Sequence, residues 1–236
     1  LATRPEKRLG SDAVWDKAEQ ALAHGLEKLQ IPFQITPGEG AFYGPKVEIH
    51  FVDAIGRSWQ MGTIQCDFQL PERFELKYVG EDNSEHRPVM LHRAILGSLE
   101  RFIGVYLEHC AGQFPTWLAP VQVQILNVTS KQDPYCEEVL AMLKQAGVRA
   151  HYDSRNEKLG YKIREAQLQK VPYMLTIGDA EMQARTVSIR FKNGKVENGL
   201  ALDTFVEQLS KEIQNRDLLS SWLQARIENV NQEAQN

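Results

Sequence analysis

The sequence has few cysteines, no long apolar run and no excess of positive charge. Its cysteines are Cys66, Cys110 and Cys136, with no Cys-x-x-Cys pair, so we expect reduced thiols and a protein of the cytoplasm or an organelle matrix. No apolar run reaches the length of a membrane-spanning helix and no secretory segment opens the chain, so we expect no membrane partner. A net charge of -4 and a pI of about 5.9 exclude a generally basic nucleic-acid binder, but they allow a local basic patch that binds RNA.

A chain of 236 residues with 42% hydrophobic and 25% charged residues is typical of a globular protein. This length suffices for one large domain or two ordinary ones, each with its own core. Because the first residue is Leu1 rather than methionine, we expect the chain to be a piece of a longer protein.

The first half of the chain predicts a helix, then strands, then a second helix. Apolar residues at helical spacing follow the plausible caps Ser11 and Asp12, and residues 53–57 read as a hairpin turn between two alternating runs. The expected elements are a helix at 11–29, strands at 47–51, 59–63 and 89–91, and a helix at 95–109 with a buried apolar face.

Two prolines in the segment 114–120 interrupt the helical period, and we place a domain boundary there. Beyond it the order β-α-β-α-β-β-α predicts a mixed sheet flanked by helices. The expected elements are strands at 121–128, 148–152, 173–177 and 186–191, and helices at 134–146, 159–169 and 203–214. A polar tail after Arg216 contains one amphipathic stretch, from Leu219 to Ile227.

The glycine-rich segment Gly38–Lys46 has residue types suited to binding. Its glycines would let the backbone approach a ligand closely, while Tyr43 and Lys46 offer a hydroxyl and an ammonium. A glycine-rich turn with a chance lysine explains the same residues equally well.

The segment 59–65 contains two amides that could act together. Gln60 and Gln65 would lie on opposite faces of a regular strand, unless Gly62 marks a bulge that resets the phase. A half-buried strand with exposed amides is the simpler interpretation.

In the segment 89–102 a strand leads into a helix, with His92 near the strand end and Arg101 in the helix. An arginine in such a place suits an anionic phosphate, because its planar fork makes paired charge-assisted bonds. An isolated histidine is more often structural than a ligand, since a catalytic zinc needs about three protein ligands. No cysteine or other histidine stands at an obvious ligand spacing from His92.

Several long segments of the sequence resemble the threonyl-tRNA synthetases. Residues 97–102 resemble motif 3 of the class II aminoacyl-tRNA synthetases, which ends in a near-obligatory arginine, matched here by Arg101. The other similar segments are residues 3–12, 38–46, 78–82, 114–120, 153–160 and 170–174. The resemblance extends from Leu1 to about Leu218 and does not include the tail.

This resemblance implies an α/β fold class and a division into domains. We expect the C-terminal portion of a class II catalytic domain, built on an antiparallel sheet, at 1–117. An α/β anticodon-binding domain with a mixed five-stranded sheet is expected at 118–216, and a C-terminal tail at 217–236.

The resemblance also implies an activity, the ATP-dependent activation of threonine to threonyl-adenylate and transfer of the threonyl group to tRNA(Thr). Arg101 would hold the ATP γ-phosphate, with Mg²⁺ accompanying the nucleotide, in chemistry that depends on positioning and charge stabilisation. The implied catalytic residues are Arg101, Gln60 and Lys46. The implied ATP-binding residues are Gln60, Thr63, Gly97, Ser98 and Arg101.

The implied threonine-binding residues are Tyr43, Lys46, Gln65 and His92. His92 matches a Zn²⁺ ligand of the family, and the other ligands are expected upstream of this chain. Zinc would bind the amino and hydroxyl groups of threonine and so reject valine, which has no hydroxyl.

In the second domain the implied partner is the anticodon stem-loop, whose unpaired bases present open edges to side chains. The implied anticodon-binding residues are Asn156, Arg164, Glu181 and Arg190. Lys158, Lys162, Arg164 and Lys170 recur at near-helical spacing and predict a local basic patch, with a solvated charged face as the alternative.

The family has its motifs 1 and 2 upstream of the position of Leu1, so we expect this chain to be inactive alone and the full-length enzyme to be a homodimer. A different interpretation is a catalytically decayed synthetase paralogue that acts as an RNA-binding or regulatory protein. The presence together of Arg101, His92, Gln60 and Gln65 argues against it. A structural subunit with no affinity for tRNA is a third, weaker interpretation.

Overall fold

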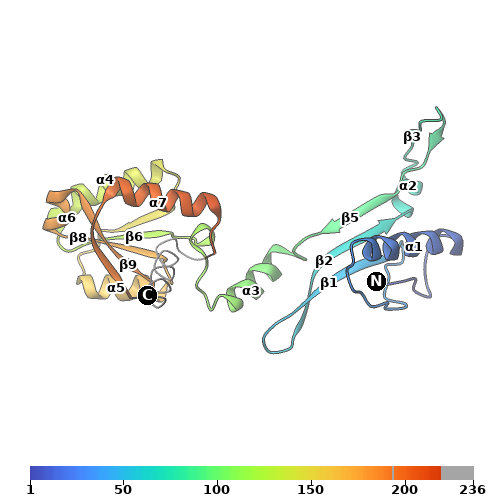
Figure 1. Cartoon of the computed structure of the whole chain (residues 1–236), viewed down its shortest axis with the longest axis horizontal. Helices are drawn as coiled ribbons and strands as arrows, with labels where there is room; N and C mark the ends of the chain where they lie inside the picture. Colours follow the sequence, from blue (N-terminus) through green and yellow to red (C-terminus); the bar gives the residue numbers. More distant parts are fainter. Residues whose placement is uncertain (193, 219–236) are drawn as a thin grey trace, which may run out of the picture. The chain divides into compact units, whose positions relative to one another are not determined.

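The structure is a computed structural model that describes residues 1–192 and 194–218, so the amphipathic stretch of the tail lies outside the described residues. The chain divides into two compact units, one of residues 1–109 and one that begins at Cys110 (Figure 1). Both units combine helices with sheets, which confirms the α/β fold class. Within the described part of the chain, no helix has the length and apolar content that a membrane crossing requires.

The first unit contains an antiparallel sheet in the order β1-β2-β5. The predicted first helix and the predicted hairpin are confirmed, and Asp53 Oδ1 closes the turn by accepting the amide of Arg57 at 2.8 Å. The elements are α1 (Asp12–Lys28), β1 (Lys46–Val52), β2 (Ser58–Asp67), α2 (Gln69–Arg73), β3 (Tyr78–Val79), β4 (Glu85–His86), β5 (Met90–Ala94) and α3 (Leu99–His109).

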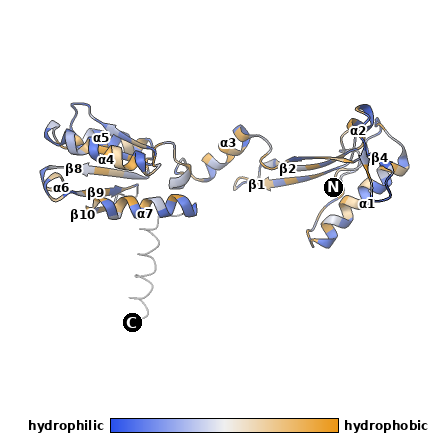
Figure 2. Ribbon diagram, turned by 90° about the horizontal axis from the view of Figure 1, so that it is seen from above, coloured by the Kyte–Doolittle hydropathy of each residue, from blue (hydrophilic) through white to orange (hydrophobic). Residues whose placement is uncertain are grey.

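The last helix of this unit differs from its prediction in two ways. It begins at Leu99 rather than at Ile95, because Gly97 has a left-handed φ of 70° that a continuing helix cannot contain. The predicted buried face is wrong, since α3 has no buried residue and its Leu99 is 65% exposed. Figure 2 shows the apolar residues distributed along this helix.

Strand β2 contains a β-bulge next to Gly62. Ile49 pairs with Gly62, but the next residue of β1, His50, pairs with Gln60, so Met61 has no partner in β1. An extra residue of this kind shifts the alternation of side chains by one position. The bulge considered from the sequence is therefore present.

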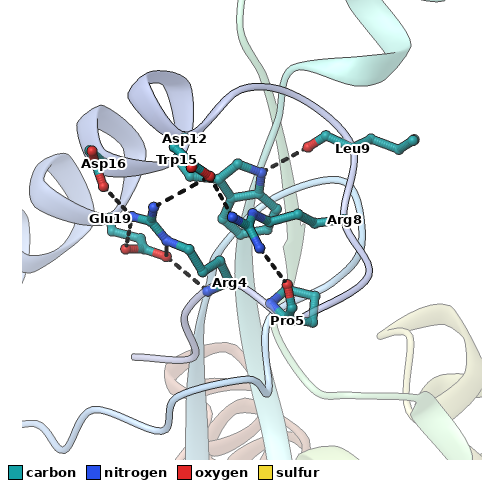
Figure 3. Close-up of polar contacts among 8 residues, drawn as sticks. All are labelled: Arg4, Pro5, Arg8, Leu9, Asp12, Trp15, Asp16 and Glu19. Carbon is teal, nitrogen blue, oxygen red and sulfur yellow. Dashed lines mark hydrogen bonds and ion pairs between the residues drawn. The ribbon is translucent and has the colours of Figure 1, made fainter.

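The segment before α1 is held against that helix by two arginines (Figure 3). Arg4 donates to Glu19 at 2.7 Å and to Asp16, while Arg8 donates to Asp12. The indole Nε1 of Trp15 donates to the carbonyl of Leu9 at 2.8 Å, with Trp15 only 2% exposed.

The second unit is a five-stranded mixed sheet, as the resemblance implies, and its strand order is β10-β9-β8-β6-β7. Figure 1 shows α4 and α7 on one face and α5 on the other. The larger core lies under α4 and α7, where Val123, Ile125, Leu175 and Phe205 are fully buried. The elements are η1 (Thr116–Leu118), β6 (Val123–Asn127), η2 (Ser130–Gln132), α4 (Asp133–Gln145), β7 (Ala150–Asp153), α5 (Leu159–Leu168), β8 (Tyr173–Ile177), α6 (Asp179–Ala184), β9 (Thr186–Phe191), β10 (Val196–Ala201) and α7 (Leu202–Asn215).

The proline-containing segment near the predicted boundary is bound to this second unit. Arg149 Nη2 donates to the carbonyls of Trp117 and Ala119, both at 2.8 Å, and Gln122 donates to the carbonyl of Thr116 at 2.9 Å. The domain limits at 117 and 118 remain a prediction, and the compact units divide at an earlier residue, His109.

Gly44 permits the closest backbone approach in the glycine-rich loop. A Cβ at this position would lie 1.6 Å from the carbonyl oxygen of Cys66, so Gly44→Ala forces the loop away from β2. We expect a loss of about 3 kcal/mol in the free energy of unfolding of the first unit, the upper part of the range for overpacking. Urea denaturation, with amide hydrogen exchange in β1 and β2 as the probe, measures this loss of free energy.

The matched control is Gly25→Ala in α1, where a Cβ meets nothing within 4 Å. This change should stabilise the unit by about 0.4–1 kcal/mol, because alanine reduces the freedom of the unfolded chain. Equal stability of Gly44→Ala and the wild type would contradict the packing described here.

Candidate functional site

The bulge at Met61 places the two glutamines of β2 on one face of the sheet. Gln65 pairs with Lys46 and Gln60 pairs with His50, and these partners are four residues apart in β1, so they share a face. Across the other edge of β2, Gln65 also pairs with His92 of β5. Four predicted site residues, Lys46, Gln60, Gln65 and His92, therefore lie on the same face, which we call the polar face.

Glu48 connects two of the predicted catalytic residues. Its Oε1 accepts from Lys46 Nζ at 2.6 Å and from Gln60 Nε2 at 2.8 Å. Gln60 Nε2 also donates to Thr63 Oγ1 at 3.0 Å. Burial raises the pKa of Glu48, but the bond and charge of Lys46 outweigh it and lower that pKa below its ordinary value. The carboxylate is thus a fixed anion between a cation and an amide.

Arg101 reaches the polar face from α3. Its Nη1 donates to the carbonyl oxygen of Gln60 at 2.9 Å, and its amide donates to Ser98 Oγ at 3.1 Å. A Cβ on Gly97 would lie 3.0 Å from the same carbonyl, so glycine is needed for this close approach. Among the predicted ATP-binding residues, Arg101 therefore bonds both Gln60 and Ser98, and Gly97 lies against the Gln60 carbonyl.

Tyr43 and His92 line a cavity of about 250 Å³ in the first unit. The Tyr43 hydroxyl donates to Gln65 Oε1 at 2.8 Å, and the rings of Tyr43 and His92 meet edge to face with centroids 6.1 Å apart. His92 Nε2 lies 2.8 Å from Asp67 Oδ2. The remaining lining residues are Leu9, Phe42, Asp67, Gln69, Leu70 and Arg73.

Asp67 is a buried anion in the wall of this cavity. Burial raises its pKa, but hydrogen bonds from His92 and from the amides of Leu70 and Gln69 outweigh that effect and hold the pKa below its ordinary value. Its side chain is 2% exposed. The carboxylate is therefore available as an acceptor for the imidazole at neutral pH.

In the second unit the predicted anticodon residues lie on the α5 side of the sheet. Arg190 pairs with Met174, whose side chain packs in the small cluster beneath α5. Arg164 is exposed on α5, and Asn156 is exposed in the loop before this helix. Glu181 joins this side through Ser188 of β9, which donates to Glu181 Oε1 at 2.7 Å.

Glu181 accepts hydrogen bonds within the unit, whereas one donor of Arg190 has no partner among the described residues. Burial raises the pKa of Glu181, but bonds from Ser188 and from the Gly178 amide outweigh it and lower the pKa, so the carboxylate is an anionic acceptor. Arg190 Nη1 donates to the Gly194 carbonyl at 3.3 Å, whereas its buried Nε has no hydrogen-bond partner among the described residues. A buried donor without a partner costs free energy.

Lys162 does not belong to the predicted basic patch. Its side chain is buried, with Nζ donating to Asn127 Oδ1 at 2.6 Å and to the Asp153 carbonyl at 3.0 Å. Lys158, Arg164 and Lys170 are exposed. The spacing of these basic residues along the helix does not show which of them faces the sheet, so it could not distinguish the buried Lys162 from its exposed neighbours.

The sequence reasoning missed Glu48 and Asp67, two carboxylates that hold predicted site residues in place. Neither stands in a motif with a known ligand, so no local pattern marks them. Regular strand alternation is the signal that could have found them, because Glu48 lies two residues from Lys46 and Asp67 lies two residues from Gln65, so each shares the face of its neighbour.

Two family models match successive parts of the chain. Residues 10–110 match the tRNA synthetase class II core domain (G, H, P, S and T), and residues 122–212 match the anticodon binding domain. The threonine–tRNA ligase of Bdellovibrio bacteriovorus is 59% identical over 221 residues, which are 94% of this chain and 34% of that protein. That of Acetivibrio thermocellus is 54% identical over 92% of this chain and 34% of its own length.

Among solved structures, the RNA binding domain of threonyl-tRNA synthetase from Cryptosporidium parvum is similar, with a TM-score of 0.85 and 39% identity. The match covers 93% of this chain and 55% of that one. The chain thus contains a class II aminoacyl-tRNA synthetase core domain and an anticodon-binding domain. The chain is similar to these threonine–tRNA ligases over 94% and 92% of its own length, and it spans about a third of the length of the curated relatives it matches.

The ion pair of Glu48 with Lys46 yields a pH-dependent prediction. Because the folded pKa of Glu48 is lowered, its contribution to stability is fully present above the unfolded pKa of about 4.3. That contribution is lost as the pH falls through the folded pKa. Glu48→Gln should lower the free energy of unfolding of the first unit by about 1.5 kcal/mol at pH 7, the value of a charged hydrogen bond.

The measurement is urea denaturation of both proteins between pH 3 and 7, using the ordinary pKa of about 4.3 as the reference point. The control Glu72→Gln removes an exposed pair with Arg87 at 3.4 Å and should change stability by less than about 0.5 kcal/mol. A difference between wild type and Glu48→Gln that stays constant down to pH 3 would refute the role given to the charge of Glu48.

Proposed function

We propose that the chain acts in the threonine–tRNA ligase reaction, with the polar face of the first unit binding ATP and threonine and the second unit binding the anticodon of tRNA(Thr). The observation that carries this proposal is the bulge at Met61, which brings Lys46, Gln60, Gln65 and His92 to one face in a chain 59% identical to such a ligase. The reaction couples adenylate formation to transfer of the threonyl group.

Arg101 is the proposed ligand of the ATP γ-phosphate. The bond from Nη1 to the Gln60 carbonyl fixes the guanidinium beside β2, which leaves its other N–H groups for phosphate oxygens. A preorganised cation of this kind stabilises charge that develops in phosphoryl chemistry without moving during the reaction. Gln60, Thr63, Gly97 and Ser98 would position the nucleotide, and Mg²⁺ would accompany it by neutralising phosphate charge.

Threonine is proposed to bind where Tyr43, Lys46, Gln65 and His92 converge. Gln65 has an amide whose oxygen is taken by Tyr43, so its N–H₂ group remains to donate to the substrate. Lys46 is neutralised by Glu48, so it acts as a positioned donor rather than as an isolated charge.

Zinc fits only one residue of this site. A zinc ion needs about three protein ligands, and the described residues contain no group of three histidine, cysteine, aspartate or glutamate side chains arranged to hold a metal. His92, with the buried carboxylate of Asp67 behind it, has the chemistry of a single ligand. The described residues thus do not form a complete zinc site.

The proposed RNA surface combines an anionic acceptor with cationic donors. Glu181 would accept from a base amino group, and Arg190, whose Nε lacks a partner among the described residues, would donate to a base or phosphate. Asn156 and Arg164, both exposed, would contact the same stem-loop. Stem-loops expose unpaired base edges that such side chains can read. The homodimer and the cytoplasmic location remain predictions.

The test of RNA recognition is binding of the chain to tRNA(Thr), compared with the same tRNA altered at the second and third anticodon bases, at one salt concentration. We expect tight binding that the altered bases weaken. Arg190→Ala should reduce the affinity for the native tRNA by about tenfold or more and reduce the discrimination, as loss of a base-reading arginine does.

The matched control removes a positive charge from the opposite side of the sheet. Lys211 lies on α7 in an exposed pair with Glu207, so Lys211→Ala should leave the affinity unchanged. Equal loss of affinity in both variants would mean that the effect is general electrostatics. No binding by the wild-type chain would overturn the proposed RNA surface.

A second candidate function is RNA binding without catalysis. It is favoured by the second unit's self-contained sheet and core and by the similarity to a structure described as an RNA binding domain. Threonine-dependent pyrophosphate exchange distinguishes the two. We expect none from a polypeptide of these residues alone, because His92 is its one candidate zinc ligand on the polar face. Restored exchange on adding the rest of a ligase relative would favour the ligase, and its failure would favour the RNA-binding protein.

A further inference from the structure

Asp67 makes three hydrogen bonds at the end of β2. Its Oδ1 accepts the backbone amides of Gln69 at 2.7 Å and Leu70 at 3.0 Å. Its Oδ2 lies 2.8 Å from Nε2 of His92, and the carboxylate side chain is only 2% exposed. Two backbone donors thus fix the plane of the carboxylate, and one oxygen is directed at the imidazole.

This geometry determines which nitrogen of His92 carries the proton. An ionised carboxylate can only accept hydrogen bonds, so the imidazole must donate from Nε2. In the neutral ring the lone pair then lies on Nδ1, because one nitrogen is the donor and the other the acceptor. Tyr43 contacts the same ring edge to face, which limits its rotation.

We propose that Asp67 is a positioning residue that holds His92 as the Nε2–H tautomer and makes Nδ1 the atom offered to a ligand in the cavity. The use of that atom by threonine rests on the proposed function, whereas the tautomer does not. Asp67 would act on the substrate only through His92.

Asp67→Asn provides a sharp test, because the two backbone amides also fix how the asparagine lies. Its oxygen must face the amides of Gln69 and Leu70, so its N–H₂ group faces His92 Nε2. Nε2 then becomes the acceptor, and the proton moves to Nδ1. Loss of packing alone would not move the proton from Nε2 to Nδ1. The protonated nitrogen of His92 in this variant therefore distinguishes a positioning role of Asp67 from a merely structural one.

The experiment is nitrogen-15 NMR of the histidine rings in the full chain at a pH of about 8, where an ordinary histidine is neutral. We expect Nε2–H to exceed Nδ1–H by at least about ten to one in the wild type, given the strength of a charge-assisted bond. We expect the opposite preference in Asp67→Asn. A wild-type ring protonated on Nδ1, or an Asp67→Asn ring that keeps Nε2–H, would overturn the proposal.

Asp82→Asn is the matched control. Asp82 bonds Nε2 of a different, exposed histidine, His86, at 2.8 Å, so this variant should leave the His92 signals unchanged. Adding threonine to the same samples tests the proposed function separately. If the tautomers behave as expected but threonine moves no signal of His92 or Tyr43 even after the rest of a ligase relative is added, the threonine site is refuted while the assignment of Asp67 stands.

Discussion

A single unpaired residue in β2 determines the composition of the polar face. Met61 has no partner in β1, so the strand alternation shifts by one position between Gly62 and Gln60. Without this shift Gln60 would point away from Glu48 and Lys46, and Arg101 would lose the carbonyl geometry that now receives its Nη1. The arrangement shows why a bulge next to a functional site is a built feature rather than a defect in pairing.

Buried ionic groups fix the loops in both units. In the first unit the carboxylate of Asp67 ties the end of β2 to α2 and to His92. In the second unit the ammonium of Lys162 ties the ends of β6 and β7 to the first turn of α5. Each ion is compensated by two or more hydrogen bonds, which burial of a charge requires. The loop that contains Asn156 follows directly from the segment that Lys162 holds.

Much of the second unit could be predicted from the sequence, since β8 and β9 were placed at Tyr173–Ile177 and Thr186–Phe191 as observed. These strands are apolar runs between clear breaks. Strand β10 and helix α6 were missed, because Val196–Ala201 is mostly exposed and Asp179–Ala184 is only six residues long. Neither contains the apolar periodicity on which such predictions depend.

The candidate site was only partly predictable. Tyr43 and Arg101 lie in segments that resemble the family, and the resemblance names them as site residues. The roles of Glu48 and Asp67 depend on hydrogen bonds to residues of other elements, which the sequence does not show. Lys162 was misplaced because a helical series of lysines does not reveal which member faces inward. In each case the missing information was the phase of an element relative to its neighbours.

The central claim is that Met61 is the extra residue that sets the phase of Gln60. The test is the coupling energy between the side chains of Glu48 and Gln60. Double-mutant cycles measured by urea denaturation give this energy in two variants, one without Met61 and one without both Met61 and Gly62. Removing Met61 alone leaves a regular hairpin in which Gln60 still pairs with His50, so the coupling should stay within about 0.5 kcal/mol of its wild-type value. Removing both Met61 and Gly62 moves Gln60 to the other face, so the coupling should vanish. Loss of the coupling on deletion of Met61 alone, or its survival in the double deletion, would contradict the account.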